Sequence, residues 1–438
     1  MTRRELLLQA AAAPAARRAA SAPNFVFIIS DDHHYQCLGA AGNPHISTPR
    51  LDALARRGVL FSQGIISTPQ CGPSRGILLS GRESSVNGLR SNGQLQFGPD
   101  PGPTVVEQLR RSGYDTALVG KWHIRPRPAE CGFSSAPLWL PGGGSRYVNP
   151  ELRRGFDGAL REEAGHITGL FTEAGVQVIR EARRPYLLWL AYNAPHTPWT
   201  AVERFQQPYV GKPSAELAPP AHPRGGRPFD WSTYYAVISH LDDAVGRVVA
   251  AVEESGQWRN TVIVLLGDNG FLCGTKNLNG KVRPWEESIR VPMLAAGGPV
   301  RAGVRTDCGA ASVDWPATLL DLAGLRPERP LHGRSLRPVL ESGRGGPAES
   351  FAVWDDPAPN ALTAGGGPVE PYRLVRTATH KLIVWASGRQ ALYHHPSDPG
   401  EENDLSAQPA SPPLLEDLRK RLRSRLQATG DAAAAWLT

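Results

Sequence analysis

The chain has 438 residues, of which 41% are hydrophobic and 20% charged, as is ordinary for a folded globular protein. This length exceeds one compact core, so we expect a large domain and a smaller one. The formal charge of +7 falls to +4 when residues 1–22 are set aside, which is too little to indicate nucleic-acid binding. No apolar run is long enough for a transmembrane helix.

The first residues have the pattern of a targeting segment. Arg3 and Arg4 precede three leucines and an alanine-rich stretch, and Arg17 and Arg18 follow it. A twin arginine before a weakly apolar region resembles a bacterial twin-arginine export signal. We therefore predict that residues 1–22 are an export signal and that the protein is periplasmic or secreted. A disordered alanine-rich tail is the alternative.

Four apolar runs predict strands buried on both faces of a sheet: Asn24–Ser30, Thr116–Gly120, Tyr186–Tyr192 and Thr261–Leu266. Helical patterns lie between them, at Pro49–Arg57, Thr104–Ser112, Phe171–Arg184 and Thr233–Ser255. For the first helix, Thr48 is the expected cap and Gly58 the expected end. The alternation predicts an α/β layered domain whose central sheet, mostly parallel or mixed, is flanked by helices.

Polar side chains follow each predicted strand at its carboxyl end. They are Asp31 and Asp32, then Lys121 and His123, then His196, and last Asp268 and Asn269. In open α/β sheets, ligands bind beyond the carboxyl ends of the strands. Four polar clusters at four such ends therefore predict one shared site, although each cluster alone could be ordinary loop polarity.

A second, smaller unit is expected after the Gly/Pro-rich stretch Gly343–Pro347. Tyr372–Thr377 and Lys381–Trp385 alternate like an antiparallel pair, and Leu414–Leu426 reads as an amphipathic closing helix. We predict a catalytic domain at 23–340 and a C-terminal α+β subdomain at 350–438.

The cysteines are an odd number and follow no zinc spacing: Cys37, Cys71, Cys131, Cys273 and Cys308. An exported protein with this count keeps at least one unpaired thiol. In the segment Cys71–Arg75, Pro73 suits the first turn of a helix that Gly81 would end. Cys71 is then at a helix N-terminus, which favours anions. A buried structural cysteine is the alternative.

The segment Cys71–Arg82 resembles the signature of the type I sulfatases, in which a separate maturation enzyme oxidises the cysteine to formylglycine. Gly113–His123 resembles the second signature of that family. Further similar segments come in the family's order: Asp31-Asp32, Thr48–Asp52, Ala194–Pro198, Asp268–Gly270, Glu286–Pro292 and Tyr393–Leu405. The resemblance runs from about Pro23 to the C-terminus. It implies an alkaline-phosphatase-like fold and hydrolysis of sulfate esters.

Asp31, Asp32, Asp268 and the amide of Asn269 offer hard oxygen ligands, which suit Ca²⁺ or Mg²⁺ rather than zinc. Without a cation, the clustered carboxylates would repel each other. We therefore predict one divalent cation, with residue 71 as a further ligand. The alternative for Asp31 and Asp32 is a turn or helix-capping pair.

The chemistry of a sulfate ester assigns a task to each remaining candidate. The hydrated aldehyde at position 71 would supply the nucleophile as its gem-diol. Lys121 and Lys281 would hold the sulfuryl oxygens, and His196, with Lys281 beside it, would protonate the leaving alcohol and bind substrate. His123 could take the proton when the aldehyde is regenerated, and Arg75 would orient residue 71.

Two ambiguities remain around these candidates. Lys276 competes locally with Lys281, because Gly274–Asn279 lacks the histidine that many sulfatases have there. His33 and His34 are expected to lie around the cation site or to face substrate rather than to ligate.

Sulfated carbohydrate is the substrate class that the resemblance favours. The loops Pro141–Gly144 and Lys212–Arg227 are expected to border the site. Four tryptophans on predicted loops could stack on sugar rings or be buried anchors: Trp139, Trp199, Trp231 and Trp285. The alternatives are an enzyme for aryl or choline sulfates or for phosphonate or phosphate esters, and a non-catalytic binder of sulfated glycans in which Cys71 stays a thiol.

Overall fold

The computed structural model describes residues 22–223, 226–358 and 367–437. The predicted export signal at 1–22 lies, apart from Ala22, outside these residues. No helix in the described part of the chain is long and apolar enough to cross a membrane.

A mixed sheet of eight strands forms the centre of the larger part of the molecule. In spatial order the strands are β10 (Val304–Thr306), β2 (Gly58–Phe61), β9 (Met293–Ala296), β8 (Thr261–Gly267), β1 (Asn24–Ser30), β7 (Tyr186–Ala191), β3 (Asp115–Lys121) and β4 (Ser135–Leu140). The run from β8 through β1, β7 and β3 to β4 is parallel, whereas β9 is antiparallel to both β8 and β2. This arrangement confirms the predicted mixed sheet.

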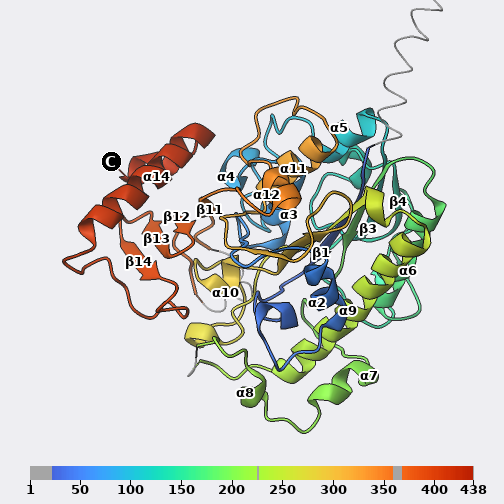
Figure 1. Cartoon of the computed structure of the whole chain (residues 1–438), viewed down its shortest axis with the longest axis horizontal. Coiled ribbons are helices and arrows are strands. Elements are labelled where there is room, and N and C mark those ends of the chain that lie inside the picture. Colours follow the sequence, from blue (N-terminus) through green and yellow to red (C-terminus); the bar gives the residue numbers. More distant parts are fainter. Residues whose placement is uncertain (1–21, 224–225, 359–366, 438) are drawn as a thin grey trace, which may run out of the picture.

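Helices cover both faces of this sheet (Figure 1). Along β1, Phe25 and Phe27 face one core, whereas Val26 and Ile28 face the other, as the alternation of a strand requires. The first core is completed by α3 (Cys71–Ser80), α5 (Val105–Arg111), α11 (Asp314–Leu322) and α12 (Arg337–Ser342). The second is completed by α2 (Pro49–Arg56), α6 (Ile167–Glu181) and α9 (Trp231–Glu254).

Shorter elements connect these layers. They are α4 (Ser84–Asn87), β5 (Glu151–Leu152), β6 (Arg161–Glu162), α7 (Glu203–Gln206), α8 (Ser214–Leu217) and α10 (Glu286–Ile289). Short 3-10 helices occur at Gly39–Ala41, Pro128–Cys131, Gln207–Tyr209, Trp258–Asn260, Thr275–Asn277 and Ala432–Leu437.

The sequence predicted that Thr48 caps the start of α2 and that Gly58 ends the helix, and both assignments were wrong. Thr48 precedes the helix, but its side chain caps no backbone N–H. Asp242, from α9, accepts the N–H groups of Arg50 and Leu51 at 3.1 and 2.7 Å instead. Gly58 does not end the helix, because it is the first residue of β2. The helix start is therefore stabilised by a tertiary contact that local sequence does not show.

The C-terminal part forms an antiparallel sheet in the order β11 (Glu349–Trp354), β12 (Tyr372–Thr377), β13 (His380–Trp385) and β14 (Gln390–His394). One of its faces packs with Ile77 and Ile289 of the larger part. The other is covered by Leu418 and Leu422 of α14 (Pro412–Thr429). The predicted strand pair and closing helix are confirmed, whereas the boundaries 23–340 and 350–438 stay proposals.

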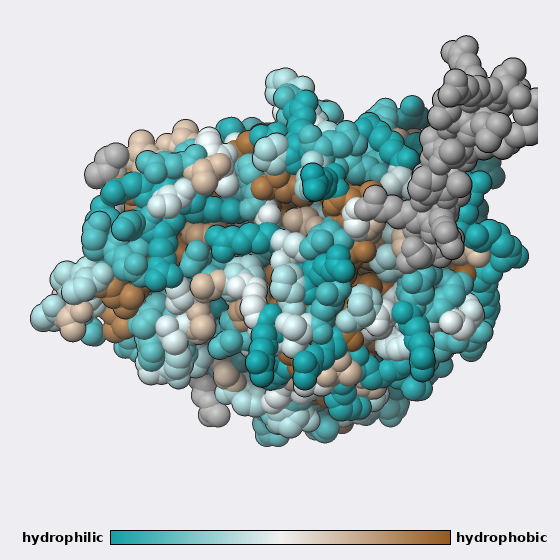
Figure 2. Space-filling model, turned by 45° about the horizontal axis from the view of Figure 1, so that its top comes forward, coloured by the Kyte–Doolittle hydropathy of each residue, from teal (hydrophilic) through white to brown (hydrophobic). Residues whose placement is uncertain are grey.

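The surface of the molecule is mostly polar, because the apolar side chains are largely buried. The face drawn in Figure 2 is mostly hydrophilic, with apolar residues in small separate areas. Among the described residues, the exposed large apolar side chains are Val148, Leu160 and Val210. Scattered exposure of this kind is normal for a globular protein.

Candidate active site

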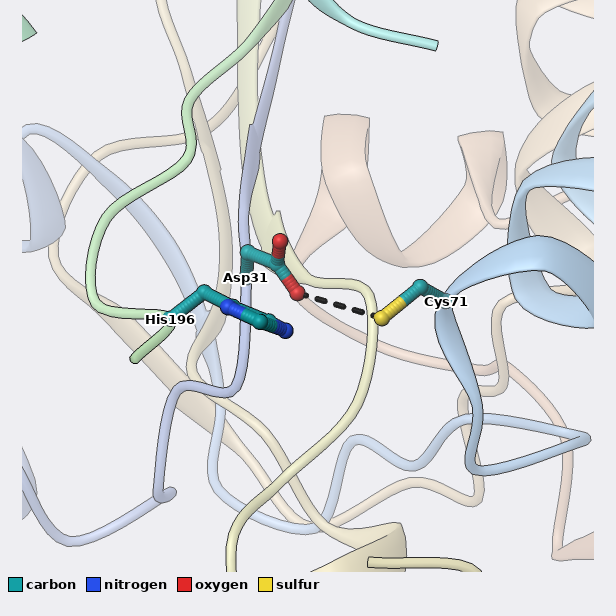
Figure 3. A group of neighbouring side chains, drawn as sticks. All are labelled: Asp31, Cys71 and His196. Carbon is teal, nitrogen blue, oxygen red and sulfur yellow. Dashed lines mark hydrogen bonds between the residues drawn. The ribbon is translucent and has the colours of Figure 1, made fainter. Parts of the chain in front are cut away.

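The four polar clusters meet at one edge of the sheet. Since β8, β1, β7 and β3 are parallel neighbours, their carboxyl ends lie side by side. Residues from three of these ends are fully buried there, namely Asp31, Lys121, Asp268 and Asn269. Figure 3 shows Asp31 after its strand, Cys71 at the start of α3 and His196 on a loop, with the three side chains turned toward a common space.

Three carboxylates crowd this space. One potential ligand atom from each of Asp31, Asp32, Asp268 and Cys71 lies within 4.8 Å of the others. Burial and the neighbouring Asp31 raise the pKa of Asp268 to about 6, although Arg75 opposes the shift. Burial also disfavours the charge on Asp31, but the cations around it, Lys121 first, hold its pKa well below the usual range. The raised pKa of Asp268 reflects the repulsion between carboxylates that a bound cation would relieve.

Asn269 adds an oxygen that has no partner in the protein. Its Nδ2 donates to Asp32 Oδ1 at 2.6 Å and to the carbonyl of Gly270 at 2.8 Å, whereas its buried Oδ1 accepts no hydrogen bond. Buried acceptors are rarely left unpaired. An all-oxygen donor set with one orphaned member fits a hard divalent cation held by Asp31, Asp32, Asp268 and Asn269.

Cys71 is the first residue of α3, a helix that is buried along its whole length. Its thiol donates to Asp31 Oδ1 at 3.3 Å, drawn as the dashed line in Figure 3, and accepts from Lys281 Nζ at 2.9 Å. Burial, reinforced by Asp31, raises the pKa of the thiol to about 12. The unmodified thiol is thus protonated at neutral pH and is a poor nucleophile. Its sulfur marks the place that an oxygen of an oxidised residue 71 would take.

The first turn of α3 is less free for anions than the sequence suggests. The N–H of Gly72 donates to Asn92 Oδ1 at 3.1 Å, and the N–H of Asn92 donates to Gln70 Oε1 at 2.6 Å. Asn92 therefore fixes the start of the helix that carries Cys71. No motif in the sequence pointed to it.

Lys121 forms a buried ion pair with Asp31. Its backbone carbonyl accepts from Arg75 Nη1 at 2.6 Å, and the same guanidinium donates to Asp268 from Nε and Nη2 at 3.1 and 2.8 Å. Arg75 thus joins α3, β3 and the end of β8. This geometry suits the predicted orienting role.

Lys281, rather than Lys276, is the second lysine of the centre. Lys281 forms a buried ion pair with Asp32 and also reaches the thiol. The ammonium of Lys276 instead donates to the carbonyls of Gly400 and Glu401 at 3.1 and 2.7 Å. It therefore ties its loop to the C-terminal segment and has no place among the carboxylates.

His196 lies beside Asp32 and is partly exposed. Its Nε2 is 3.8 Å from Asp32 Oδ2, and its side chain is 22% exposed. The hydroxyl of Tyr147 donates to the carbonyl of His196 at 2.8 Å and so fixes its backbone. Burial lowers the pKa of His196, although Asp31 and Asp32 oppose this. The lowered pKa favours the neutral ring, so the cationic, proton-donating form gains population as the pH falls.

His123 is partly buried, and a glycine loop lies against it. A Cβ on Gly143 would lie 2.5 Å from His123 Nε2, and one on Gly144 would lie 3.0 Å from His196 Cε1. A Cβ on Gly142 would meet nothing nearer than 3.9 Å. The loop Pro141–Gly144 therefore lies directly against both histidines, and two of its glycines allow that approach.

His33 and His34 follow Asp31 and Asp32 in the chain and bond to neighbouring polar groups rather than to the carboxylates. His33 pairs with Ser30 Oγ at 2.9 Å and with the carbonyl of Cys37 at 3.1 Å. The N–H of His34 donates to the hydroxyl of Tyr234 at 2.9 Å, and this hydroxyl in turn donates to the carbonyl of Asp32. The two histidines and Tyr234 support the backbone of the acidic pair. Sequence patterns gave no signal for Tyr234.

A cavity of about 480 Å³ opens beside the centre. Asp32, His196 and Lys281 line one part of it, and Trp199, Phe229 and Phe271 line another. Of the four candidate tryptophans, Trp199 is thus placed at this cavity. The expectation that all four lie on loops was wrong, because Trp139 is a buried residue of β4 and Trp231 a buried residue of α9. Trp285 contacts Lys276 instead.

Comparison with known proteins gives consistent matches. The family model described as "Sulfatase" matches residues 23–325, and "N-sulphoglucosamine sulphohydrolase, C-terminal" matches residues 277–428. An ulvan-active sulfatase of Formosa agariphila is 26% identical over 93% of this chain and 82% of its own length. An N-acetylglucosamine-6-O-sulfatase of Bacteroides thetaiotaomicron is 24% identical, over 87% of this chain and 82% of its own.

One solved structure, a complex of a protein with its substrate D-glucosamine-2-N,6-O-disulfate, superposes with a TM-score of 0.83. It covers 94% of this chain and 99% of the other at 23% identity. This likeness confirms the predicted alkaline-phosphatase-like fold.

Proposed function

The chain belongs to the sulfatase family and is a sulfuric ester hydrolase, and we propose that it removes sulfate from a sulfated carbohydrate by means of a formylglycine at position 71. The observation that carries the proposal is the meeting of Cys71 with three carboxylates and two lysines in one buried centre.

The proposed cation is Ca²⁺ or Mg²⁺, held by Asp31, Asp32, Asp268, Asn269 and an oxygen of residue 71. A divalent ion there would supply positive charge that favours an ionised hydroxyl and a negatively charged sulfuryl group. The carboxylates that surround Cys71 and the unpaired Asn269 oxygen support this site. Hard oxygen donors select such ions over zinc.

The oxidised residue 71 would supply the oxygen nucleophile that sulfate-ester cleavage needs. Lys121 and Lys281, both buried and positively charged beside it, would bind the sulfuryl oxygens and stabilise charge that develops on them. Arg75 would hold α3 and the backbone of Lys121 in register. None of these groups has to move far, because each is already fixed by a buried ion pair or hydrogen bond.

His196 would donate the proton to the leaving alcohol, since it lines the cavity next to Lys281. The buried Nδ1 of His123 has no hydrogen-bond partner among the described residues. This free nitrogen makes it the proposed proton acceptor when residue 71 releases sulfate.

Carbohydrate is the proposed substrate class for two reasons. The similar proteins include an ulvan-active sulfatase and an N-acetylglucosamine-6-O-sulfatase. The cavity beside His196 also presents aromatic side chains, on which sugar rings commonly stack. A separate maturation enzyme would oxidise Cys71. Residues 1–22 would direct export, so that the protein acts in the periplasm or outside the cell.

The test is sulfate release by the matured protein from sulfated sugars, aryl and choline sulfates, and phosphate and phosphonate esters. We expect sulfated sugars to be hydrolysed, activity to vanish on chelation, and Ca²⁺ or Mg²⁺ to restore it. A preference for phosphate or phosphonate esters would overturn the proposal. Full activity of Cys71→Ala or of the exhaustively chelated protein would also overturn it. Binding of sulfated glycans without turnover by the matured, metal-loaded protein would favour the non-catalytic alternative.

A further inference from the structure

The cavity beside the catalytic centre differs in character from the centre itself. Its outer wall is built from the rings of Trp199, Phe229 and Phe271, whose centroids are 5.2 to 6.4 Å apart. The indole N–H of Trp199 donates to the carbonyl of Pro195 at 2.6 Å, so this ring is held in place and offers its apolar surface. A rigid aromatic wall suits the C–H face of a sugar ring.

Asp230 is the charged residue of this outer part. Beyond Asp32, His196 and Lys281, it carries the one formal charge among the described residues that line the cavity. Asp230 is exposed, and the ion pairs among the described cavity residues join Asp32 to His196 and Lys281 rather than Asp230. Asp230 precedes α9, and its Oδ1 accepts the N–H of Thr233 at 3.0 Å, which fixes the carboxylate at the cavity.

Asn279 supplies a neutral polar group on the same cavity. Its Oδ1 is buried and accepts no hydrogen bond in the structure. A hydroxyl or an amide N–H on a bound ring would give this oxygen a donor, whereas a second sulfate would offer it only acceptors. The outer cavity therefore holds the carboxylate of Asp230 and, in Asn279, a buried acceptor that the protein leaves without a donor.

From this arrangement, and resting on the proposed sulfatase function, we propose that the cavity binds a single sugar ring whose one anionic group is the sulfate to be removed. The aromatic wall takes the face of the ring, and Asn279 accepts from a neutral substituent. Asp230 repels a second sulfate or a carboxylate on the same ring. The catalytic centre thus binds one sulfate, and the outer cavity disfavours a second one.

The substitution Asp230→Asn isolates the charge. Asparagine has nearly the same shape and keeps an oxygen for the N–H of Thr233, so α9 retains its cap. The matched control is Glu254→Gln, which removes one negative charge from the far end of the same 24-residue helix, about 35 Å away.

The experiment measures kcat/KM of the matured, metal-loaded wild type and both variants on hexosamines that carry the same sulfate ester. Within each substrate pair, one hexosamine carries a neutral N-acetyl group and is mono-sulfated. The other carries an N-sulfate and so has a second anionic group. We expect the wild type to prefer the mono-sulfated member, and Asp230→Asn to reduce that preference about tenfold, as one unit charge at short range would. Glu254→Gln should not change the ratio.

An unchanged ratio in Asp230→Asn, or equal rates of the wild type on both members, would overturn the inference. So would hydrolysis of an aryl sulfate by a wild type that accepts no sugar of the panel. In each of these cases the proposed sulfatase function would survive. Failure to release sulfate from any ester, the aryl sulfate included, would instead remove the proposed function.

Discussion

Burial and charge give the titratable side chains around Cys71 different tasks. Burial favours the neutral form of Lys281, but Asp32, followed by Cys71 and Asp31, outweighs it and holds the pKa of Lys281 well above its usual range. Lys281 is therefore a permanent cation, which suits the binding of sulfuryl oxygens. Burial lowers the pKa of His196 below its ordinary value of 6.5, so this ring can exchange protons under mildly acidic conditions.

The division of labour in the pocket can be tested with two leaving groups. A sugar alcohol needs a proton in the transition state, whereas an aryl sulfate leaves as a stabilised phenolate and needs little help. His196→Ala should lower kcat/KM for a sugar sulfate by about a hundredfold or more, and far less for an aryl sulfate. The measurement belongs below pH 6.5, where more of the wild-type His196 is protonated.

Lys121→Ala is the control for this comparison. It should impair both substrates, because Lys121 would bind the sulfuryl oxygens that they share. Equal losses on the two substrates in His196→Ala would mean that His196 binds or positions substrate. The proton donor would then be sought at Lys281.

The residues proposed for the chemistry could be named from the sequence, because most of them follow a strand end or lie in a dense motif. Their supports could not. Asn92 holds the start of α3, and Tyr234 holds the backbone of Asp32, but both act through tertiary contacts. An isolated asparagine or tyrosine in a sequence carries no sign of such a contact. The choice between Lys281 and Lys276 likewise needed the position of Gly400.

Among the elements, the loop after β4 lies so close to His123, a candidate catalytic residue, that it leaves little room for a side chain. Neither Gly142 nor Gly143 adopts a positive φ, so an alanine is compatible with the backbone at both positions. A methyl group at position 143 would meet His123, whereas one at position 142 would meet nothing nearer than 3.9 Å. The loop therefore provides a matched pair of substitutions.

Gly143→Ala should lower kcat by at least about tenfold, because the added methyl group displaces His123 or the loop, and a small misplacement in an active site is costly. Gly142→Ala should be close to wild type. Steady-state kinetics on a sugar sulfate and the unfolding temperature of each variant are the measurements. Similar kcat values for the two variants would show that contact with His123 does not matter for turnover.

The elements that could be predicted are those with a sequence pattern long enough to recognise. The long apolar runs of β1, β7 and β8 identified the parallel core of the sheet. The short strands β2, β9 and β10 carry too few residues for a period to be seen. α6 starts at Ile167, one turn before the predicted Phe171, after His166 accepts the N–H of Thr168 through its ring. A histidine is an uncommon cap, which is why the start was missed.

At the scale of the whole molecule, a buried ion network joins α10, in the larger part, to the C-terminal sheet. The carboxylate of Glu286, in α10, binds Arg376 of β12 through two hydrogen bonds of 2.9 and 2.7 Å and lies 3.3 Å from Lys381 of β13. Glu401 accepts the N–H of Glu286 at 2.9 Å. Glu286 lies five residues after Lys281, so the network also fixes the segment that carries this catalytic candidate.

Removing one partner of such a pair leaves a buried charge without compensation. Arg376→Met should lower the free energy of unfolding by about 3–5 kcal/mol. Arg111→Met is the control, because Arg111 is 57% exposed in its pair with Glu328 and should cost less than about 1 kcal/mol. Denaturant unfolding of both variants decides the matter. An equal effect would mean that the network contributes little to stability.

The proposed hydrolysis of sulfate esters depends most on the oxidation of Cys71, and one measurement tests this dependence directly. Sulfate release from a sugar sulfate is measured with protein produced with and without the maturation enzyme, and the mass of the Cys71 peptide gives the oxidised fraction in each preparation. Because the proposed nucleophile is an oxygen that only the oxidised residue carries, we expect no turnover by the unmodified protein, and a rate proportional to the oxidised fraction in the other. Equal rates from preparations with different oxidised fractions would contradict the account.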